Sequence, residues 1–131
     1  MILLDTHVVI WAAIEPKRLS RAAASALRRA RVADGLALAA ISLWEIASLF
    51  ARGRVQTYGT VETSVRQVLE TVGVIVKPIT VEIAALATQF PENYPRDPAD
   101  RLIAATARAE GIALVTQDEN IRRCTLLKTI W

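Results

Sequence analysis

The chain has 131 residues, of which 53% are hydrophobic and 22% are charged, with a net charge of +3. This length predicts one domain over residues 1–131, and this composition excludes an intrinsically disordered chain. No run approaches the ~18 apolar residues of a membrane-spanning helix, so we expect no membrane association. Cys124 is the only cysteine and no signal peptide is recognisable, which together predict a cytoplasmic protein without disulfides.

Short apolar runs alternate with helical patterns along the whole chain. The apolar runs predict buried strands at residues 2–4, 36–41, 74–76, 112–115 and, at an edge, 126–127. The helical patterns predict helices at residues 6–14, 20–31, 42–51, 60–72, 80–88 and 97–110, with a short helix after residue 118. Such alternation is typical of an α/β fold, here with a four- to five-stranded, mainly parallel sheet between layers of helices.

Acidic residues recur at the ends of the predicted strands and at the starts of the predicted helices. They are Asp5, Glu45, Asp97, Asp100 and Asp118. In an open parallel sheet these positions gather at the carboxyl edge of the strands, where ligands bind. Carboxylates gathered at one edge repel one another unless a cation joins them, and Mg²⁺ prefers oxygen ligands. The pattern therefore indicates a site for a divalent metal ion.

Each acid also has a local explanation as a helix cap. Asp5 could cap the helix that follows it, and Glu45 could form a capping box with Ser42, which for Glu45 alone is the favoured interpretation. Other acids at helix starts have similar explanations: Asp97, Asp100 and Asp118. Capping does not explain why acids follow three different strands, nor why Asp100 borders the apolar face of its helix.

Four segments resemble, in this order, the motifs of PIN-domain ribonucleases, and more closely those of the VapC toxins of bacterial toxin–antitoxin pairs. They are LLDTH at residues 3–7, ISLWEIA at 41–47, RDPADRLIAATA at 96–107 and LVTQD at 114–118. The resemblance covers essentially the whole chain. It implies a PIN-like α/β/α sandwich and a metal-dependent endoribonuclease that uses Mg²⁺, with Mn²⁺ as a substitute.

The resemblance also assigns roles to individual residues. The acids that match the family's catalytic, metal-binding positions are Asp5, Glu45, Asp100 and Asp118. The residues that match supporting positions are Thr6, Asp97 and Thr116. A water activated by the metal would attack an RNA phosphate. We expect 5′-phosphate and 3′-hydroxyl ends, because no second histidine or lysine pair supports chemistry at the 2′-hydroxyl group.

Basic and aromatic residues give weaker signals. The basic residues that could guide RNA are Lys17, Arg18, Arg21 and Arg28, although they could equally form solvated helix faces. His7 is interpreted as a packing or hydrogen-bonding residue. Trp11 and Trp44 have the spacing of core or interface residues rather than of base-stacking residues.

The resemblance further implies a homodimer bound by small VapB-like antitoxin chains, which in turn bind DNA. Two other classes of function stay open. One is a phosphohydrolase of small phosphate esters, which would usually carry an Asp-x-Asp sequence where this chain has Asp5, Thr6 and His7. The other is a non-catalytic binding module in which the acids only cap helices.

Overall fold

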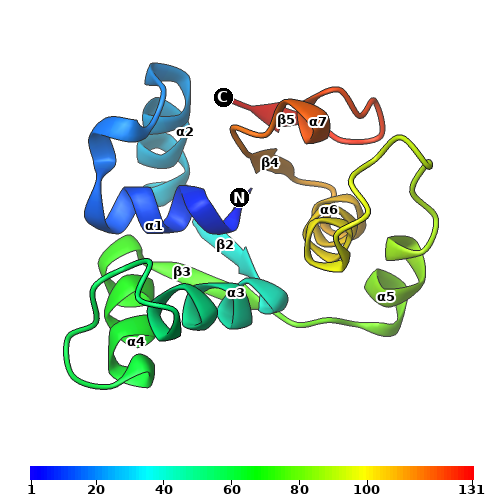
Figure 1. Cartoon of the computed structure of the whole chain (residues 1–131). Coiled ribbons are helices and arrows are strands. Elements are labelled where there is room, and N and C mark those ends of the chain that lie inside the picture. The colour runs from blue at the N-terminus through cyan, green and yellow to red at the C-terminus, as the bar shows by residue number, and fades with distance from the viewer.

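The computed structural model describes residues 1–131 and contains one sheet with helices on both of its faces (Figure 1). The strands are β1 (Ile2–Leu4), β2 (Leu36–Ala39), β3 (Val74–Lys77), β4 (Ala113–Val115) and β5 (Thr129–Ile130). The helices are α1 (Thr6–Ile14), η1 (Pro16–Arg18, a 3₁₀ turn), α2 (Arg21–Arg31), α3 (Ala40–Ala51), α4 (Val61–Val72), α5 (Val81–Ala87), α6 (Pro98–Glu110) and α7 (Glu119–Arg122). The α/β class predicted from the sequence is confirmed.

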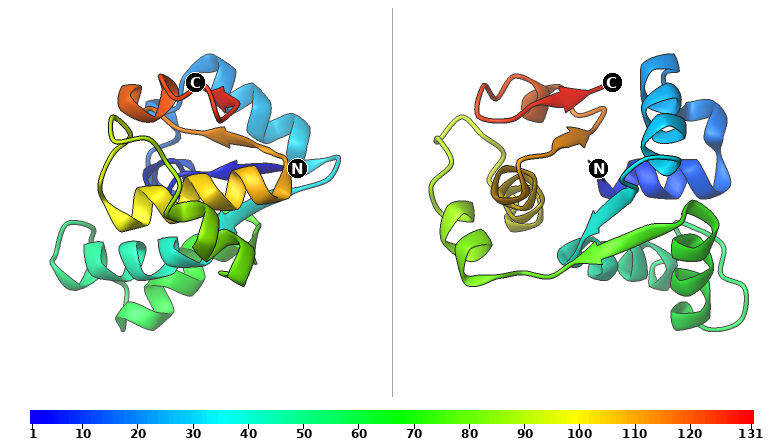
Figure 2. Two further views of the ribbon diagram at one scale, coloured as in Figure 1. Left: turned by 90° about the vertical axis from the view of Figure 1, so that its right-hand side faces the viewer. Right: turned by 180° about the vertical axis from the view of Figure 1, so that it is seen from behind.

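The order of the strands creates a crevice beside β1. The sheet has the order β3-β2-β1-β4-β5, and every neighbouring pair is parallel. The chain moves outward from β1 through β2 to β3 and then crosses to the other side of β1 for β4 and β5. Figure 2 shows β1 and β4 side by side. Open α/β sheets bind ligands at such a reversal, beyond the carboxyl ends of the strands.

Both faces of the sheet are buried against helices. Leu3 and Leu114 belong to a core cluster that contains side chains of α5, α6 and α7. Leu4 and Val115 alternate with them and belong to a second cluster, which contains side chains of α1, α2, α3 and α4. Figure 1 shows these two groups of helices on opposite sides of the sheet. Burial on both faces explains why the central strands are uninterrupted apolar runs in the sequence.

Side-chain caps fix several helices at the residues where the sequence predicted them to begin. Ser20, Thr60 and Thr80 each accept a hydrogen bond from the backbone N–H three residues further on. Gly111 ends α6 with a φ of 65°, a conformation that glycine adopts without a steric penalty. None of the helices combines the length and hydrophobicity that crossing a bilayer requires.

Two boundaries differ from the sequence predictions. α3 begins at Ala40, so Ser42 lies within the helix and the prediction that it is the N-cap is wrong. The run from Leu36 to Ile41 is apolar throughout, and hydrophobicity alone does not separate the end of a strand from the start of a helix. The strand predicted at residues 126–127 is also wrong. Backbone bonds from Leu114 to Lys128 (2.9 Å) and from Thr116 to Ile130 (3.1 Å) place the fifth strand at Thr129–Ile130 instead.

Candidate functional site

Asp5 is held between the ends of β1 and β4. Its backbone N–H donates to the carbonyl of Val115 at 3.0 Å. Its Oδ1 accepts a hydrogen bond from the N–H of Thr6 at 2.8 Å, and its Oδ2 accepts one from the Thr116 hydroxyl at 2.7 Å. Thr116 in turn accepts from the N–H of Asp118 at 3.1 Å. Each Asp5 oxygen keeps a lone pair for a further ligand, and the carboxylate cannot turn without breaking these bonds.

Glu45 points from α3 toward Asp5 instead of capping its own helix. Its Oε1 lies 2.5 Å from the Thr6 hydroxyl, which also lies 2.8 Å from the Ser42 hydroxyl. Thr6 has one hydroxyl proton, which the carboxylate accepts, so Ser42 must be the donor in the bond with Thr6. The capping-box interpretation of Glu45 is therefore wrong. Its partner is a residue of α1, 39 positions earlier in the chain.

Asp100 brings a carboxylate without hydrogen bonds from the opposite face of the sheet. It lies in the first turn of α6, which begins at Pro98, next to the predicted start of this helix at residue 97. The hydroxyl of Tyr94 donates to its backbone carbonyl at 3.2 Å, but its side chain accepts no hydrogen bond. Burial, followed by the negative charge of Asp5 and of Asp97, raises the pKa of Asp100 to about 7. A half-buried carboxylate with no partner is costly, and a cation would remove that cost.

Asp97 and Asp118 cap helices and also face the site. Asp97 Oδ1 accepts from the N–H of Ala99 at 2.9 Å, and Asp118 Oδ1 accepts from the N–H of Asn120 at 2.8 Å. In both carboxylates the other oxygen takes no part in the cap. For these two acids the local explanation is thus correct, and it leaves one oxygen of each free for a ligand.

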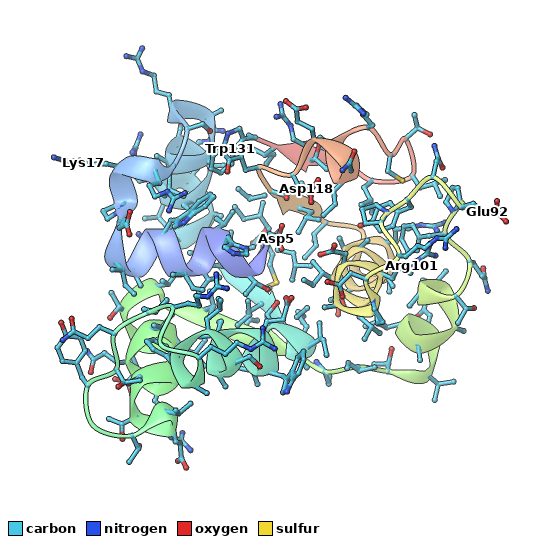
Figure 3. All side chains as sticks on the ribbon, viewed as in Figure 1. Asp5, Lys17, Glu92, Arg101, Asp118 and Trp131 are labelled. Carbon is cyan, nitrogen blue, oxygen red and sulfur yellow. The ribbon has the colours of Figure 1, made fainter.

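These acids surround one cavity of about 720 Å³ at the crevice of the sheet. Figure 3 shows Asp5 and Asp118 near the centre of the molecule, between α1 and α6. The predicted site residues that line the cavity are Asp5, Thr6, Arg18, Glu45, Asp97, Asp100 and Asp118. Thr116 supports Asp5 from behind the cavity wall. The structure adds five lining residues, namely His7, Val8, Trp11, Gln117 and Glu119.

The site has an excess of negative charge. None of the acids Asp5, Glu45, Asp97, Asp100 and Asp118 forms a salt bridge. Burial raises the pKa of Asp5, against the effect of its hydrogen bonds from Thr116 and Thr6. Burial also raises the pKa of Glu45, which the bond from Thr6 lowers and the charge of Asp5 raises further. Neighbouring carboxylates that raise one another's pKa are expected to attract a cation.

The donor set suits a hard divalent ion that keeps part of its water shell. All five acids offer oxygen ligands, which Mg²⁺ and Mn²⁺ favour. No three of these side chains are close enough to enclose an ion by themselves. Mg²⁺ is commonly held by one or two carboxylates together with water and substrate phosphates, and this open cavity leaves room for both. The residues that could hold the ion are Asp5 and Asp100, with Glu45 and Asp118 directly or through water.

Three expectations for other residues change. His7 packs only in part, because its ring centre lies 5.9 Å from that of Trp11 while its side chain is exposed, forms no hydrogen bond and lines the cavity. A signal was present in the sequence, since His7 lies two residues after Asp5 and one helical turn before Trp11. Trp11 is buried, as expected of a core residue, whereas Trp44 is 63% exposed and so is not in the core. Of the four basic residues predicted to guide RNA, only Arg18 lines the cavity.

Comparisons with known proteins identify the family. The family model of the PIN domain matches residues 2–125. The chain is 45% identical over 121 residues to ribonuclease VapC22 of Mycobacterium tuberculosis, an alignment that covers 92% of this chain and 89% of that protein. The chain belongs to the PIN-domain family and, within it, to the VapC group.

Solved structures share the fold at low sequence identity. A chain of the VapBC2 complex of Rickettsia felis, bound to a DNA fragment from its promoter, matches with a TM-score of 0.74 and 17% identity, covering 98% of this chain and 97% of that chain. A chain of DNA-bound VapBC from Salmonella typhimurium matches with a TM-score of 0.70 and 18% identity, over 98% and 97% of the two chains. A chain of FitAcB from Neisseria gonorrhoeae matches with a TM-score of 0.68 and 24% identity, over 98% and 96%. The predicted PIN-like sandwich is thereby confirmed.

Proposed function

We propose that this protein is an endoribonuclease that depends on Mg²⁺ or Mn²⁺ and acts as the toxin of a toxin–antitoxin pair, cutting a structured cellular RNA in the cytoplasm. The observation that carries the proposal is the convergence of Asp5, Glu45 and Asp100 on one cavity without any counter-ion from the protein. The 45% identity to a protein named as a ribonuclease supports the choice of RNA as the substrate.

The site residues would have different roles in hydrolysis of the phosphodiester bond. Asp5 and Asp100 would hold the ion, and the bonds from Thr6 and Thr116 keep the Asp5 carboxylate in one orientation. When bound there, Mg²⁺ or Mn²⁺ would lower the pKa of a water and would neutralise charge that builds up on the phosphate oxygens. Glu45 Oε1 is fixed by Thr6, so its other oxygen is free to orient the attacking water. In-line attack by water leaves a 5′-phosphate and a 3′-hydroxyl group.

Charge outside the cavity would guide the RNA. Lys17, Arg21 and Arg28 are exposed on η1 and α2, on the α1 side of the cavity. Long-range attraction of this kind raises the rate of association and weakens with salt. These residues need no direct contact with the phosphate that is cut.

Structures that share this fold also suggest how the protein assembles with other chains. The structures with this fold include complexes named VapBC, FitAcB and FitAB, three of them bound to DNA. We infer a homodimer silenced by a VapB-like antitoxin, which would bring the DNA-binding part of the complex. Light scattering of the purified chain, with and without the product of the neighbouring gene, measures both associations.

The decisive experiment is cleavage of total cellular RNA by the antitoxin-free protein. We expect a discrete product with Mg²⁺ or Mn²⁺, none with EDTA, and none from Asp5→Ala. Glu45→Gln is the sharper variant, because glutamine keeps a hydrogen bond with Thr6 but is a poorer metal ligand. Glu92→Gln is its matched control, since Glu92 is exposed on a loop far from Asp5 (Figure 3).

The possible outcomes separate the competing functions. Lost cleavage by Glu45→Gln at unchanged stability, with full cleavage by Glu92→Gln, supports the nuclease. Hydrolysis of p-nitrophenyl phosphate without RNA cleavage would instead support a phosphohydrolase. Inactivity of the folded protein with every metal would favour a binding module. Products that end in 2′,3′-cyclic phosphate would contradict attack by water.

A further inference from the structure

One wall of the acidic cavity has a different chemistry from the rest. It is made by His7 and Trp11 of α1 and by Arg18 of η1. Arg18 is the only lysine or arginine that lines the cavity. This single cation does not neutralise the carboxylates of the site, because no salt bridge joins Arg18 to Asp5 or Asp100. Its place at the rim therefore needs another explanation.

Arg18 is held in place by aromatic packing. Its Cζ lies 4.4 Å from the centre of the Trp11 ring, within the range of a cation–π contact. Its only ion pair is with Glu15, at 3.9 Å, between side chains that are 55% and 60% exposed, and such a pair contributes little. Stacking occupies the flat face of the guanidinium group and leaves N–H groups along its edge for another ligand.

Trp11 is itself fixed by neighbours. It is 8% exposed, and its ring centre lies 5.9 Å from that of Trp131, with the two planes inclined at 59°. Trp131 follows β5, which pairs with β4, the strand that leads to Thr116 and Asp118. The support of Arg18 and the support of Asp5 therefore both depend on the β4–β5 side of the sheet.

We propose that Arg18, oriented by Trp11 and Trp131, binds the phosphate group of the nucleotide next to the one that is cut. The proposal rests on the proposed ribonuclease function. A planar guanidinium edge matches the oxygens of a phosphodiester, which arrives with the substrate and offers Arg18 a stronger partner than its long, exposed pair with Glu15. Arg18 would thus set the register of the RNA against the carboxylates, and Trp131 would be a positioning residue that acts through Trp11.

Lys17 provides a matched control for Arg18. The two residues are adjacent in η1 and carry the same charge, but Lys17 does not line the cavity, and its side chain projects away from Asp5 and Asp118 (Figure 3). Any effect of general positive charge should be similar for Lys17→Ala and Arg18→Ala. An effect of a specific phosphate contact should appear in Arg18→Ala alone.

The test measures RNA binding, metal binding and cleavage separately. Binding of a fluorescently labelled single-stranded RNA is followed by anisotropy in EDTA over a range of salt concentrations. We expect Arg18→Ala to weaken binding about tenfold and to reduce the salt slope by about 0.7, Lys17→Ala to weaken it less than about threefold, and Arg18→Lys to lie between them. Titration with Mn²⁺ alone should be unchanged, and cleavage should show a raised KM at nearly unchanged kcat.

A double-mutant cycle tests the role of Trp131. Trp131→Ala should weaken RNA binding a few-fold in wild type and have no further effect in Arg18→Ala, because both changes remove the same contact. Trp131→Phe keeps an aromatic ring beside Trp11 and should bind RNA almost as well as wild type. It replaces Trp131→Ala in the test if that variant does not fold. Additive losses would overturn the role of Trp131.

Each remaining outcome decides one question. Equal losses in Arg18→Ala and Lys17→Ala would overturn the phosphate contact while wild-type cleavage upholds the nuclease. A change in Mn²⁺ affinity with RNA binding unchanged would show instead that Arg18 is a counter-ion of the carboxylates. Wild-type protein that neither binds nor cuts RNA would overturn this proposal and the proposed function together. RNA binding that is weakened by Arg18→Ala but not by Lys17→Ala, without any cleavage, would support the phosphate contact and overturn the nuclease.

Discussion

Thr6 links two site carboxylates through one residue. Its N–H donates to Asp5, and its hydroxyl group bonds with Glu45 and Ser42. The residue is 2% exposed, so water cannot replace a lost bond. Thr6→Val keeps the shape but removes the hydroxyl, and we expect it to lower the free energy of unfolding by about 1–3 kcal/mol and to reduce cleavage. Urea denaturation monitored by circular dichroism measures the first effect.

Thr106→Val is the control for this prediction. Thr106 is also buried, but its hydroxyl donates to the carbonyl of Leu102 inside α6 at 2.7 Å. That carbonyl keeps its helical hydrogen bond when the hydroxyl is removed. We expect a loss below about 1 kcal/mol there. Similar losses at both positions would mean that the bonds of Thr6 to Glu45 and Ser42 have no special weight.

The raised pKa of Asp100 predicts opposite effects of pH on stability and on metal binding. Burial raises this pKa to about 7 from an ordinary value of 3.8. The stabilising contribution of the neutral carboxyl is complete below the ordinary value and is lost as pH rises through 7. In EDTA we therefore expect the stability difference between Asp100→Asn and wild type to grow in favour of the variant from acid to neutral pH. A difference that does not change with pH in urea denaturation would contradict the burial of this group.

Metal affinity should change in the other direction with pH. Protons compete with the ion for Asp100, so Mn²⁺ binding should strengthen as pH rises toward 7, by at most about tenfold per pH unit from one group. Calorimetric titration with Mn²⁺ in buffers of different pH measures this slope. The slope should become shallower in Asp100→Asn.

At the scale of elements, Arg101 stabilises the loop that leads into α6 through hydrogen bonds. Its guanidinium group donates to four carbonyls of that loop and its approach, namely those of Pro95 (3.0 Å), Phe90 (3.3 Å), Pro91 (3.4 Å) and Tyr94 (3.4 Å). We expect Arg101→Met to make the loop more mobile and to speed cleavage of the loop by a protease. The variant should also weaken Mn²⁺ binding a few-fold, because the loop positions Asp97 and Asp100, which come immediately after it in the chain. Hydrogen exchange of residues 91–96 measures the loosening.

Arg108→Met is the matched variant on the same helix. Its guanidinium group lies over the Phe90 ring at 5.5 Å but donates no hydrogen bond to the loop. Exchange in the loop should therefore stay close to that of wild type. Equally fast exchange in both variants would show that apolar contact, rather than the hydrogen bonds of Arg101, holds the loop.

Local signals in the sequence were sufficient for elements that depend on neighbouring residues. The helix starts at Ser20, Thr60, Thr80 and Asp97 depend on local capping side chains, and the sequence predicted these starts correctly. Residues whose partners are distant in the chain were misjudged. Arg101, for example, contacts backbone carbonyls up to 11 positions away, which its local sequence does not indicate.

The same division holds for the site. That the acids meet could be inferred, because the carboxyl ends of parallel strands share one edge. Glu45 was assigned to a cap since Ser42 stands three residues before it, whereas its partner Thr6 comes from another helix. The wall formed by Trp11 and Arg18 could not be foreseen, because it depends on where η1 turns back over α1.

At the scale of the molecule, the site exists only in the folded sheet. The bond between Asp5 and Thr116 joins residues 111 positions apart, and it requires β1 to lie beside β4. Alternation of strands and helices predicts the layers but not the strand order β3-β2-β1-β4-β5. The site carboxylates come from the end of β1, from α3, from the start of α6 and from the turn after β4, so an unfolded chain has no comparable site.

This distribution predicts that a bound ion stabilises the whole fold. An ion that binds only the folded state raises the free energy of unfolding by about 2.7 kcal/mol at a concentration of one hundred times its Kd. We expect Mn²⁺ to raise the Tm of wild type and EDTA to reverse the shift. Asp5→Asn should abolish it, whereas Asp34→Asn should retain it, because Asp34 is 83% exposed and pairs with the terminal amine of Met1 away from the cavity. If Mn²⁺ raised the Tm of Asp5→Asn and Asp100→Asn as much as that of wild type, the ion would bind elsewhere. An ion held by both Asp5 and Asp100 must bind more weakly when either ligand is lost.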